Sequence, residues 1–284
     1  NGELTSTFKT SNGKALNLAS YLSNKALTSI VLTEGITGVG ADVFFTDYGI
    51  DVQSVSLPNT LTSIGSNAFR NIKAKKFKIS ANLSSIGANA FYGSNVNSFD
   101  LSDTKVEAIG NYAFAGSKIE KLTLNSGLES ILTSAFSGCT NLSSVSFSDS
   151  IISICDSSFE ECTSLKNLKF GKNLEFISYY AFYNCQNLQS VTIGENVKAI
   201  CCDSFGNCNA LVINGKIGST AETFAKKYGY KFNSSEVTRL KGDVDNNGII
   251  NVVDATDIQK YVANLTDENG NKFIDVNNAE DMYV

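Results

Sequence analysis

The stretch LSSVSFSDSIISICDSSFEECTS, residues 142–164, decides the fold, because the chain repeats its pattern. The next 23 residues, LKNLKFGKNLEFISYYAFYNCQN (165–187), place apolar side chains at the same points. When Leu142 is taken as position 1, these points are positions 1, 4, 6, 10, 13 and 18. Positions 4 and 6 alternate with polar residues, which is typical of a β-strand with one buried face.

Phenylalanine occupies position 18 and recurs every 22 or 23 residues along the chain. The recurrences are Phe69, Phe91, Phe114, Phe136, Phe159, Phe182 and Phe205, and Phe44 lies 25 residues before the first of them. About eight units fit between Leu27 and Ala210. A unit this short cannot enclose its own apolar side, so the units must stack on one another. Stacking predicts a repeat solenoid with a parallel β-sheet along one side and short Ser/Asn/Gly turns.

The segments IGSNAF (64–69), IGANAF (86–91) and IGNYAF (109–114) follow an L-x-x-[VL]-x-[LIF] pattern. This combination resembles the BspA-like leucine-rich repeats, and the resemblance covers about residues 27–232. It implies a leucine-rich repeat solenoid with short helical or irregular returns. It also implies a secreted or bacterial surface protein with a protein-binding or adhesive role, and it does not imply a reaction.

The ends of the solenoid need polar covers, because the outermost repeats have no further neighbour. The segment 219–232, STAETFAKKYGYKF, resembles the terminal cap of the same family. We expect residues 1–26 to cap the other end and residues 233–241 to form a short linker.

Composition excludes several classes of function. The 284 residues contain no His, which excludes His-based triads, His general bases and His metal sites. They also contain no Trp, which is the best side chain for stacking on sugars. No stretch approaches the roughly 20 apolar residues of a membrane span. Residues 242–284 carry nine acids and two bases, whereas the other 241 residues carry 19 acids and 21 bases. The acidity therefore belongs to the tail, and nucleic acid is not an expected partner.

The acidic tail begins with GDVDNNGIINVVDATD (242–257), which fits a twelve-residue calcium loop of the EF-hand kind. Calcium takes six to eight oxygen ligands, and Gly248 stands where such a loop turns sharply. The candidate ligands are Asp243, Asp245, Asn247, the carbonyl of Ile249, Asn251 and Asp254. A second copy lies 24 residues later, with candidate ligands Asp267, Asn269, Asn271, the carbonyl of Phe273, Asp275 and Asn278. We expect this second Ca²⁺ site to be weaker, because Lys272 replaces the glycine and Asn278 the closing carboxylate.

Two loop–helix units without an incoming helix resemble a type I dockerin, the module that binds a cohesin on a cellulosome scaffold. The resemblance covers residues 242–284 and implies a small all-α domain with two Ca²⁺ ions. The implied cohesin contacts are Val252, Val253, Gln259, Lys260 and Asn264 in the first copy and Val276, Asn277, Tyr283 and Val284 in the second. The two sets differ chemically, which argues against two equivalent binding modes. The alternative is that Val252 and Val253 only pack within the domain.

Cys139, Cys162, Cys185 and Cys208 each follow a repeat phenylalanine by three residues. We interpret them as a buried column of free thiols. Disulfides between neighbours are the alternative, but a parallel ladder rarely aims two Cβ atoms correctly.

Two surface features are candidates for binding. Tyr179, Tyr180 and Tyr183 form a contact anchor or a sugar platform, or else are ordinary variation of the repeat surface. The outward strand positions, 3 and 5, form a small, polar and mildly basic face that is either read by a partner or simply solvated. They are Ser54, Ser56, Lys76, Lys78, Ser98, Asp100, Lys121, Thr123, Ser144, Ser146, Asn167, Lys169, Ser190 and Thr192.

Together the two resemblances imply a secreted, non-catalytic cellulosome component for polysaccharide degradation. Its dockerin would attach it to a cell-surface scaffold, and its solenoid would bind a protein or glycan. The alternative is an enzyme-like or protease-inhibitory solenoid. Adjacent acids such as Glu160 and Glu161 seldom converge on one substrate atom, which disfavours a hydrolase.

Overall fold

The computed structural model describes residues 2–4, 7–9, 15–17, 22 and 27–234. The chain divides into one unit from Asn1 to Asn233 and another from Ser234 to Val284. The expected dockerin at 242–284, with all its predicted calcium ligands and cohesin contacts, lies outside the described residues, as does most of the expected linker.

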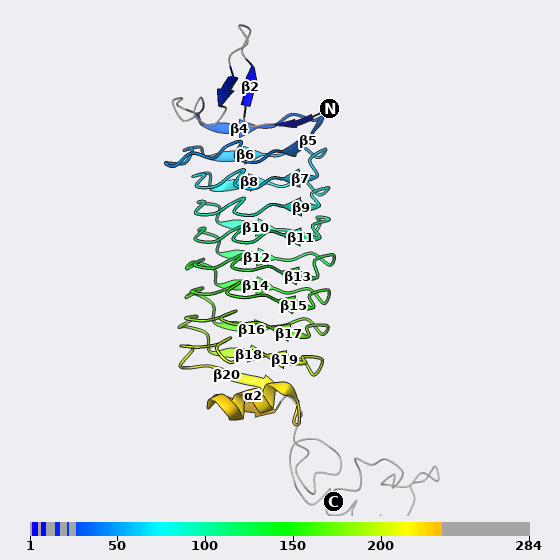
Figure 1. Cartoon of the computed structure of the whole chain (residues 1–284), viewed down its shortest axis with the longest axis vertical. Helices are drawn as coiled ribbons and strands as arrows, with labels where there is room; N and C mark the ends of the chain where they lie inside the picture. The colour runs from blue at the N-terminus through cyan, green and yellow to red at the C-terminus, as the bar shows by residue number, and fades with distance from the viewer. Residues whose placement is uncertain (1, 5–6, 10–14, 18–21, 23–26, 235–284) are drawn as a thin grey trace, which may run out of the picture. The chain divides into compact units, whose positions relative to one another are not determined.

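The first unit is a stack of repeats that each contribute two short strands, so that two parallel ladders run along the stack (Figure 1). One ladder is a nine-stranded sheet in the order β1-β5-β7-β9-β11-β13-β15-β17-β19. Its strands are β1 (Gly2–Leu4), β5 (Ile36–Val39), β7 (Ser63–Ile64), β9 (Ser85–Ile86), β11 (Ala108–Ile109), β13 (Ser130–Ile131), β15 (Ser153–Ile154), β17 (Phe176–Ile177) and β19 (Ala199–Ile200). Equivalent isoleucines pair in register, as Ile131 does with Ile154.

The second ladder is formed by positions 3–5 of the repeats, joined at its end by β21 of the C-terminal cap, and consists of three consecutive sheets. These are β4 (Ser29–Val31), β6 (Ser54–Ser56) and β8 (Lys76–Lys78); β10 (Ser98–Asp100), β12 (Lys121–Thr123) and β14 (Ser144–Ser146); and β16 (Asn167–Lys169), β18 (Ser190–Thr192), β20 (Val212–Gly215) and β21 (Lys231–Ser234). This ladder confirms the predicted parallel sheet. The nine-stranded ladder was not predicted, because most of its strands are too short to show alternation.

Near the N-terminus, β2 (Thr7–Lys9) and β3 (Ala15–Asn17) form an antiparallel pair. Within the described residues, no helix combines the length and the apolar character needed to cross a membrane.

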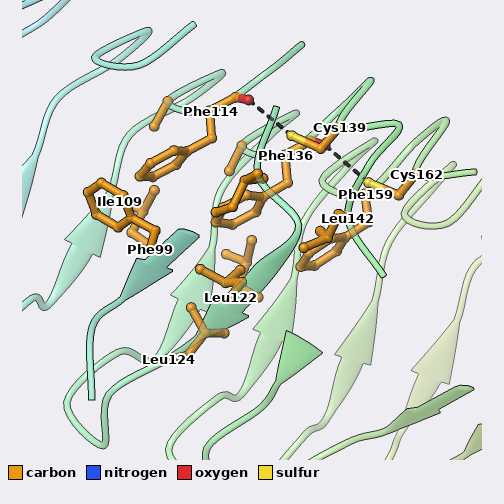
Figure 2. Packing of buried hydrophobic residues seen from close by; sticks show 14 of the residues in the cluster. Phe99, Ile109, Phe114, Leu122, Leu124, Phe136, Cys139, Leu142, Phe159 and Cys162 are labelled. Atoms are coloured by element: carbon orange, nitrogen blue, oxygen red, sulfur yellow. Dashed lines mark hydrogen bonds between the residues drawn. The ribbon is translucent and has the colours of Figure 1, made fainter. Parts of the chain in front are cut away.

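The core is built around a continuous stack of the eight repeat phenylalanines, from Phe44 to Phe205. Successive ring centroids lie 5.0–5.4 Å apart with interplanar angles of 1–15°. Figure 2 shows three consecutive members, Phe114, Phe136 and Phe159. All eight rings are buried, and burial of each contributes about 2 kcal/mol or more to folding. The spacing of the rings is the spacing of the repeats.

The cysteine column lies beside this stack. Each thiol donates a hydrogen bond to the carbonyl of the phenylalanine one repeat earlier, from Cys139 Sγ to Phe114 O at 3.0 Å and from Cys162 Sγ to Phe136 O at 3.2 Å (Figure 2). Cys185 and Cys208 repeat the contact. All seven cysteines are free, and the four column thiols are buried, which confirms their interpretation as unbridged core residues.

The segments that return from the nine-stranded ladder to the next repeat are turns, and residues 27–219 contain no helix. In most repeats their N–H groups at positions 16, 18 and 20 donate to the following repeat, and in the repeat 165–187 those at positions 18 and 20 do. In the repeat that starts at Leu142, Ser157 N donates to Tyr179 O at 2.9 Å and Glu161 N to Tyr183 O at 2.8 Å. The return turns are therefore held in the same register as the strands.

The C-terminal end of the stack is covered by α2 (Thr220–Tyr228). Ser219 Oγ accepts from Glu222 N at its start, and Gly229 takes φ 76° at its end. Phe224 packs edge-on against Phe205, with ring centroids 6.0 Å apart. The hydroxyl of Tyr230 donates to Phe205 O at 2.8 Å. Tyr230 therefore gives the last phenylalanine the contact that a cysteine provides in the repeats before it.

Candidate binding surface

Exposed apolar side chains gather on two neighbouring repeats. Nine large hydrophobic residues are exposed among those described, and four of them fall between residues 152 and 180. They are Ile152, Phe176, Tyr179 and Tyr180, with exposed fractions of 37%, 42%, 50% and 43%. If each side chain offers roughly 200 Å², the four expose about 340 Å² together, which is within the range of the largest apolar patches on monomers.

We use the name tyrosine patch for Phe176, Tyr179, Tyr180 and Tyr183, which all lie in the repeat 165–187. Tyr183 is half-buried and held from several directions. The ring of Tyr180 meets it edge-on, with centroids 5.3 Å apart, and Asn207 Nδ2 donates to its hydroxyl at 3.0 Å. Its ring also lies against Gly206, where an added Cβ would come within 2.6 Å of Tyr183 Cδ2. The patch is therefore built partly by the next repeat.

Tyr180 adopts a backbone conformation that is costly for a tyrosine. Its φ is 56°, in the left-handed region, and the same position of other repeats is occupied by Asn67 and Asn89. Asparagine tolerates this region, whereas a residue with a bulky Cβ substituent pays about 1 kcal/mol. The turn geometry belongs to the repeat, so the cost arises from the choice of an aromatic residue at this point.

Three carboxylates occupy positions of the flanking repeats that align with the patch. In the preceding repeat, Asp156 is equivalent to Tyr179 and Glu160 is equivalent to Tyr183. In the following repeat, Asp203 is equivalent to Tyr180. The bonds between return turns fix this alignment. The described ion pairs include Lys172–Asp149, Lys198–Glu175, Lys216–Glu195 and Lys226–Glu222, and none of these involves the three acids.

A shallow groove of about 530 Å³ lies beside the patch. Its lining residues are Ser126, Gly127, Glu129, Ser150, Ile152, Asn173, Glu175, Asn196 and Lys198. Much of its polar lining is satisfied internally, since Ser150 Oγ donates to Leu128 O and Lys198 Nζ lies 2.7 Å from Glu175 Oε2. Lys198 Nζ is also 5.9 Å from the ring centroid of Phe176, so the groove borders the patch.

The strand face formed by positions 3 and 5 points outward, as predicted. Its lysines Lys76, Lys78, Lys121 and Lys169 are exposed. Among the described residues of this face, the large hydrophobic side chain that is exposed is that of Val31 in β4, so the face has no group of exposed apolar side chains. The tyrosine patch is therefore the stronger candidate for a contact surface.

Two chemical features of the described residues bear on a metal site and on thiol reactivity. They contain no group of three or more Cys, Asp or Glu side chains that could hold a metal ion. Burial raises the pKa of Cys139 to about 11 and that of Cys208 to about 12, which disfavours a thiolate nucleophile. The geometry supports a contact surface.

Sequence reasoning found the three tyrosines but missed Phe176, Gly206 and Asn207. Position 12 is Ser or Ala in the other repeats from 52 to 210, so the phenylalanine of β17 departs from the pattern. That departure was a signal in the sequence. Gly206 and Asn207 gain their roles only when the next repeat is stacked on Tyr183.

The solved structures that are similar to this chain include three leucine-rich repeat proteins. A leucine-rich repeat protein from Bacteroides ovatus ATCC 8483 has 20% identity and a TM-score of 0.49, covering 83% of this chain and 78% of that one. A leucine-rich repeat protein from Eubacterium ventriosum ATCC 27560 has 18% identity and a TM-score of 0.46, covering 67% and 60%. A leucine rich cell surface protein from Faecalibacterium prausnitzii A2-165 has 18% identity and a TM-score of 0.34, covering 76% and 94%.

No curated protein sequence gives a significant match to this chain. The sequence profile of the BspA type leucine rich repeat region matches residues 14–141 and 84–212, with six copies of the repeat. The matched residues are more than half of the chain and include the whole tyrosine patch. The chain belongs to the BspA type leucine-rich repeat family.

Proposed function

We propose that this chain is a non-catalytic binding protein whose solenoid presents the tyrosine patch to a protein or glycan. The observation that carries the proposal is the pair of exposed rings, Tyr179 and Tyr180, beside a fixed Tyr183. Rings that are already ordered lose little conformational freedom on binding, so most of their contact energy is kept. Tyrosine is also enriched among the residues that dominate binding energies.

An extracellular location is part of the proposal. It is supported by the family membership of the chain and by the similar Faecalibacterium prausnitzii protein, which is described as a cell surface protein. The partner would then be an extracellular protein or a surface glycan.

The binding role is tested with an array of extracellular proteins and glycans, probed with the full chain. The test variant is Tyr179→Ser with Tyr180→Ser, and the matched control is Tyr48→Ser with Tyr112→Ser, which removes two exposed rings elsewhere. We expect a partner that the wild type and the control retain, and whose affinity for the test variant is lower by about tenfold or more. Partners that bind all three proteins equally would overturn the proposal.

We further propose that residues 242–284 form a type I dockerin that binds two Ca²⁺ ions. The support is the repetition of the acidic loop, with Asp243, Asp245 and Asp254 spaced as calcium ligands and Gly248 at the turn. A segment of this length buries too little apolar surface to fold alone, so calcium would supply much of its stability.

Attachment to a cohesin-bearing scaffold follows from this second proposal, with Val252, Val253 and Lys260 as central contacts of the first copy. Calorimetric titration of the full chain with Ca²⁺ should show two unequal sites, and Asp243→Asn with Asp245→Asn should remove the tighter one. A type I cohesin should then bind the wild type only in the presence of Ca²⁺. Binding that survives chelation, or a chain that takes up no calcium, would refute the dockerin.

A further inference from the structure

We propose that the tyrosine patch takes a cationic partner, namely a protein segment that presents arginine side chains. This inference rests on the proposed binding function and specifies the chemistry of the partner. It follows from the charge around the patch, from its ring geometry and from Arg70, which the solenoid itself holds against two aromatic rings.

The charge around the patch is negative. Asp156 and Asp203 are exposed and Glu160 is half-buried, and the register of the return turns places all three beside the tyrosines. None of them forms an ion pair with a described lysine or arginine. An anionic glycan or an acidic protein would be repelled by these carboxylates, whereas a cationic group would be attracted to them.

The lysine that borders the patch is already engaged. Lys198 lies 5.9 Å from the centroid of Phe176, but its ammonium group pairs with Glu175 at 2.7 Å. It therefore leaves the three carboxylates uncompensated. Tyr179 and Tyr180 remain open to a cation from outside.

The solenoid contains a template for this recognition. Arg70, at position 19 of its repeat, lies between the rings of Phe45 and Tyr92, with its guanidinium carbon 5.2 Å and 4.6 Å from their centroids. Its Nη1 also donates to Asn67 Oδ1 at 3.4 Å, and Asn67 occupies position 16. Phe45 and Tyr92 occupy position 19 of the two flanking repeats, so aromatic side chains at this position of the return turns can hold a guanidinium.

In the patch, positions 16 and 19 carry Tyr180 and Tyr183. The following repeat has Asp203 and Gly206 at these positions, so it supplies no arginine to the rings. An arginine from a partner can stack on these rings while Asp203 or Glu160 accepts its hydrogen bonds. Arginine suits this geometry better than lysine, because its planar guanidinium stacks on a ring and still donates in its own plane. The patch therefore selects arginine among cationic side chains.

The test measures binding of a fluorescently labelled oligoarginine peptide to the full chain by polarisation, in the presence of Ca²⁺. The charge variant is Asp156→Asn with Asp203→Asn, and the ring variant is Tyr180→Ser. The matched control is Asp51→Asn with Asp103→Asn, which removes the same charge from exposed acids in other repeats. The acidic tail is identical in all four proteins, so it cannot cause differences among them.

We expect the charge and ring variants each to weaken oligoarginine binding about tenfold, the control to change it less than about twofold, and oligolysine to bind more weakly than oligoarginine. Equal effects of the charge variant and the control would show non-specific attraction and overturn the proposal. Unchanged binding by Tyr180→Ser would also overturn it. If the array identifies a partner that depends on Tyr179 and Tyr180 while oligoarginine binding ignores them, the cationic class is wrong and the binding function stands.

Discussion

The ring of Tyr183 lies so close to Gly206 that the following repeat has no space for a side chain at that point. A Cβ on Gly206 would come 2.6 Å from Cδ2 and 2.8 Å from Cε2 of the ring. The glycine has an ordinary backbone conformation, so the close approach alone requires it. One repeat thus sets the position of an aromatic side chain in its neighbour.

Gly206→Ala should displace Tyr183 and cost about 1–3 kcal/mol of unfolding free energy, because the ring must move away from Asn207 and Tyr180. Chemical denaturation measures the loss. Gly194→Ala is the control, since a Cβ there would meet nothing within 4 Å. Adding Tyr183→Ala to Gly206→Ala should make the glycine substitution nearly neutral. Equal effects of Gly206→Ala in both backgrounds would contradict the contact.

Tyr112→Asn should stabilise the chain by about 0.5–1 kcal/mol. Tyr112 has φ 57° and is 45% exposed, so asparagine relieves the backbone cost and little packing is lost. Tyr180→Asn relieves the same cost but loses the ring contact with Tyr183, which is worth about 0.5–1.5 kcal/mol, so its stability should stay near the wild type. Thermal unfolding of the two variants compares them, and a clear destabilisation by Tyr112→Asn would show that the turn does not strain tyrosine.

The cysteine column should make the fold sensitive to alkaline pH. Burial raises the pKa of Cys139 from its ordinary 9.0 to about 11 and that of Cys208 to about 12, so the folded chain keeps protons that the unfolded chain releases. Stability is therefore full below pH 9 and falls as the pH rises from there through 11, by about 1.4 kcal/mol per thiol and pH unit.

Denaturant unfolding between pH 8 and pH 11 measures this loss. Cys139→Ser should reduce the slope, because serine stays neutral and already occupies the equivalent position as Ser117. Cys202→Ser should leave the slope unchanged, since Cys202 is exposed. A slope that is the same in all three proteins would rule out the buried thiols as its cause.

Tyr230→Phe should destabilise the chain by about 1 kcal/mol. The substitution keeps the ring on Phe224 and removes the hydrogen bond from Tyr230 Oη to Phe205 O. The control is Tyr228→Phe on α2, because the ring of Tyr228 is 38% exposed and its contact with Phe224 is kept. If both substitutions have the same effect in denaturant, the cap does not depend on that bond.

The repeated features of the fold could be predicted from the sequence because each appears many times. Eight phenylalanines at intervals of 22 to 25 residues predict one continuous stack, and four cysteines at intervals of 23 residues predict one column. The ladder through Ile131 and Ile154 was missed, since most of its strands are two residues long and show no alternation.

The binding surface could be predicted only in part, because it is made by the places where the repeats differ. Three tyrosines within five residues are visible in the sequence, but their exposure is not. Gly206 and Asn207 look like turn residues until the stack brings them against Tyr183. The calcium loops of the tail stay a prediction, since they lie outside the described residues.

The central claim is that Tyr179 and Tyr180 form the contact with a partner, and tyrosine footprinting tests it most directly. The full chain is lightly iodinated with and without the partner that it retains most tightly on the array, and each tyrosine is read by peptide mass spectrometry. We predict that the partner protects Tyr179 and Tyr180, whereas Tyr48 and Tyr228 stay equally reactive. Equal iodination of Tyr179 and Tyr180 in the free and bound chain would contradict the account.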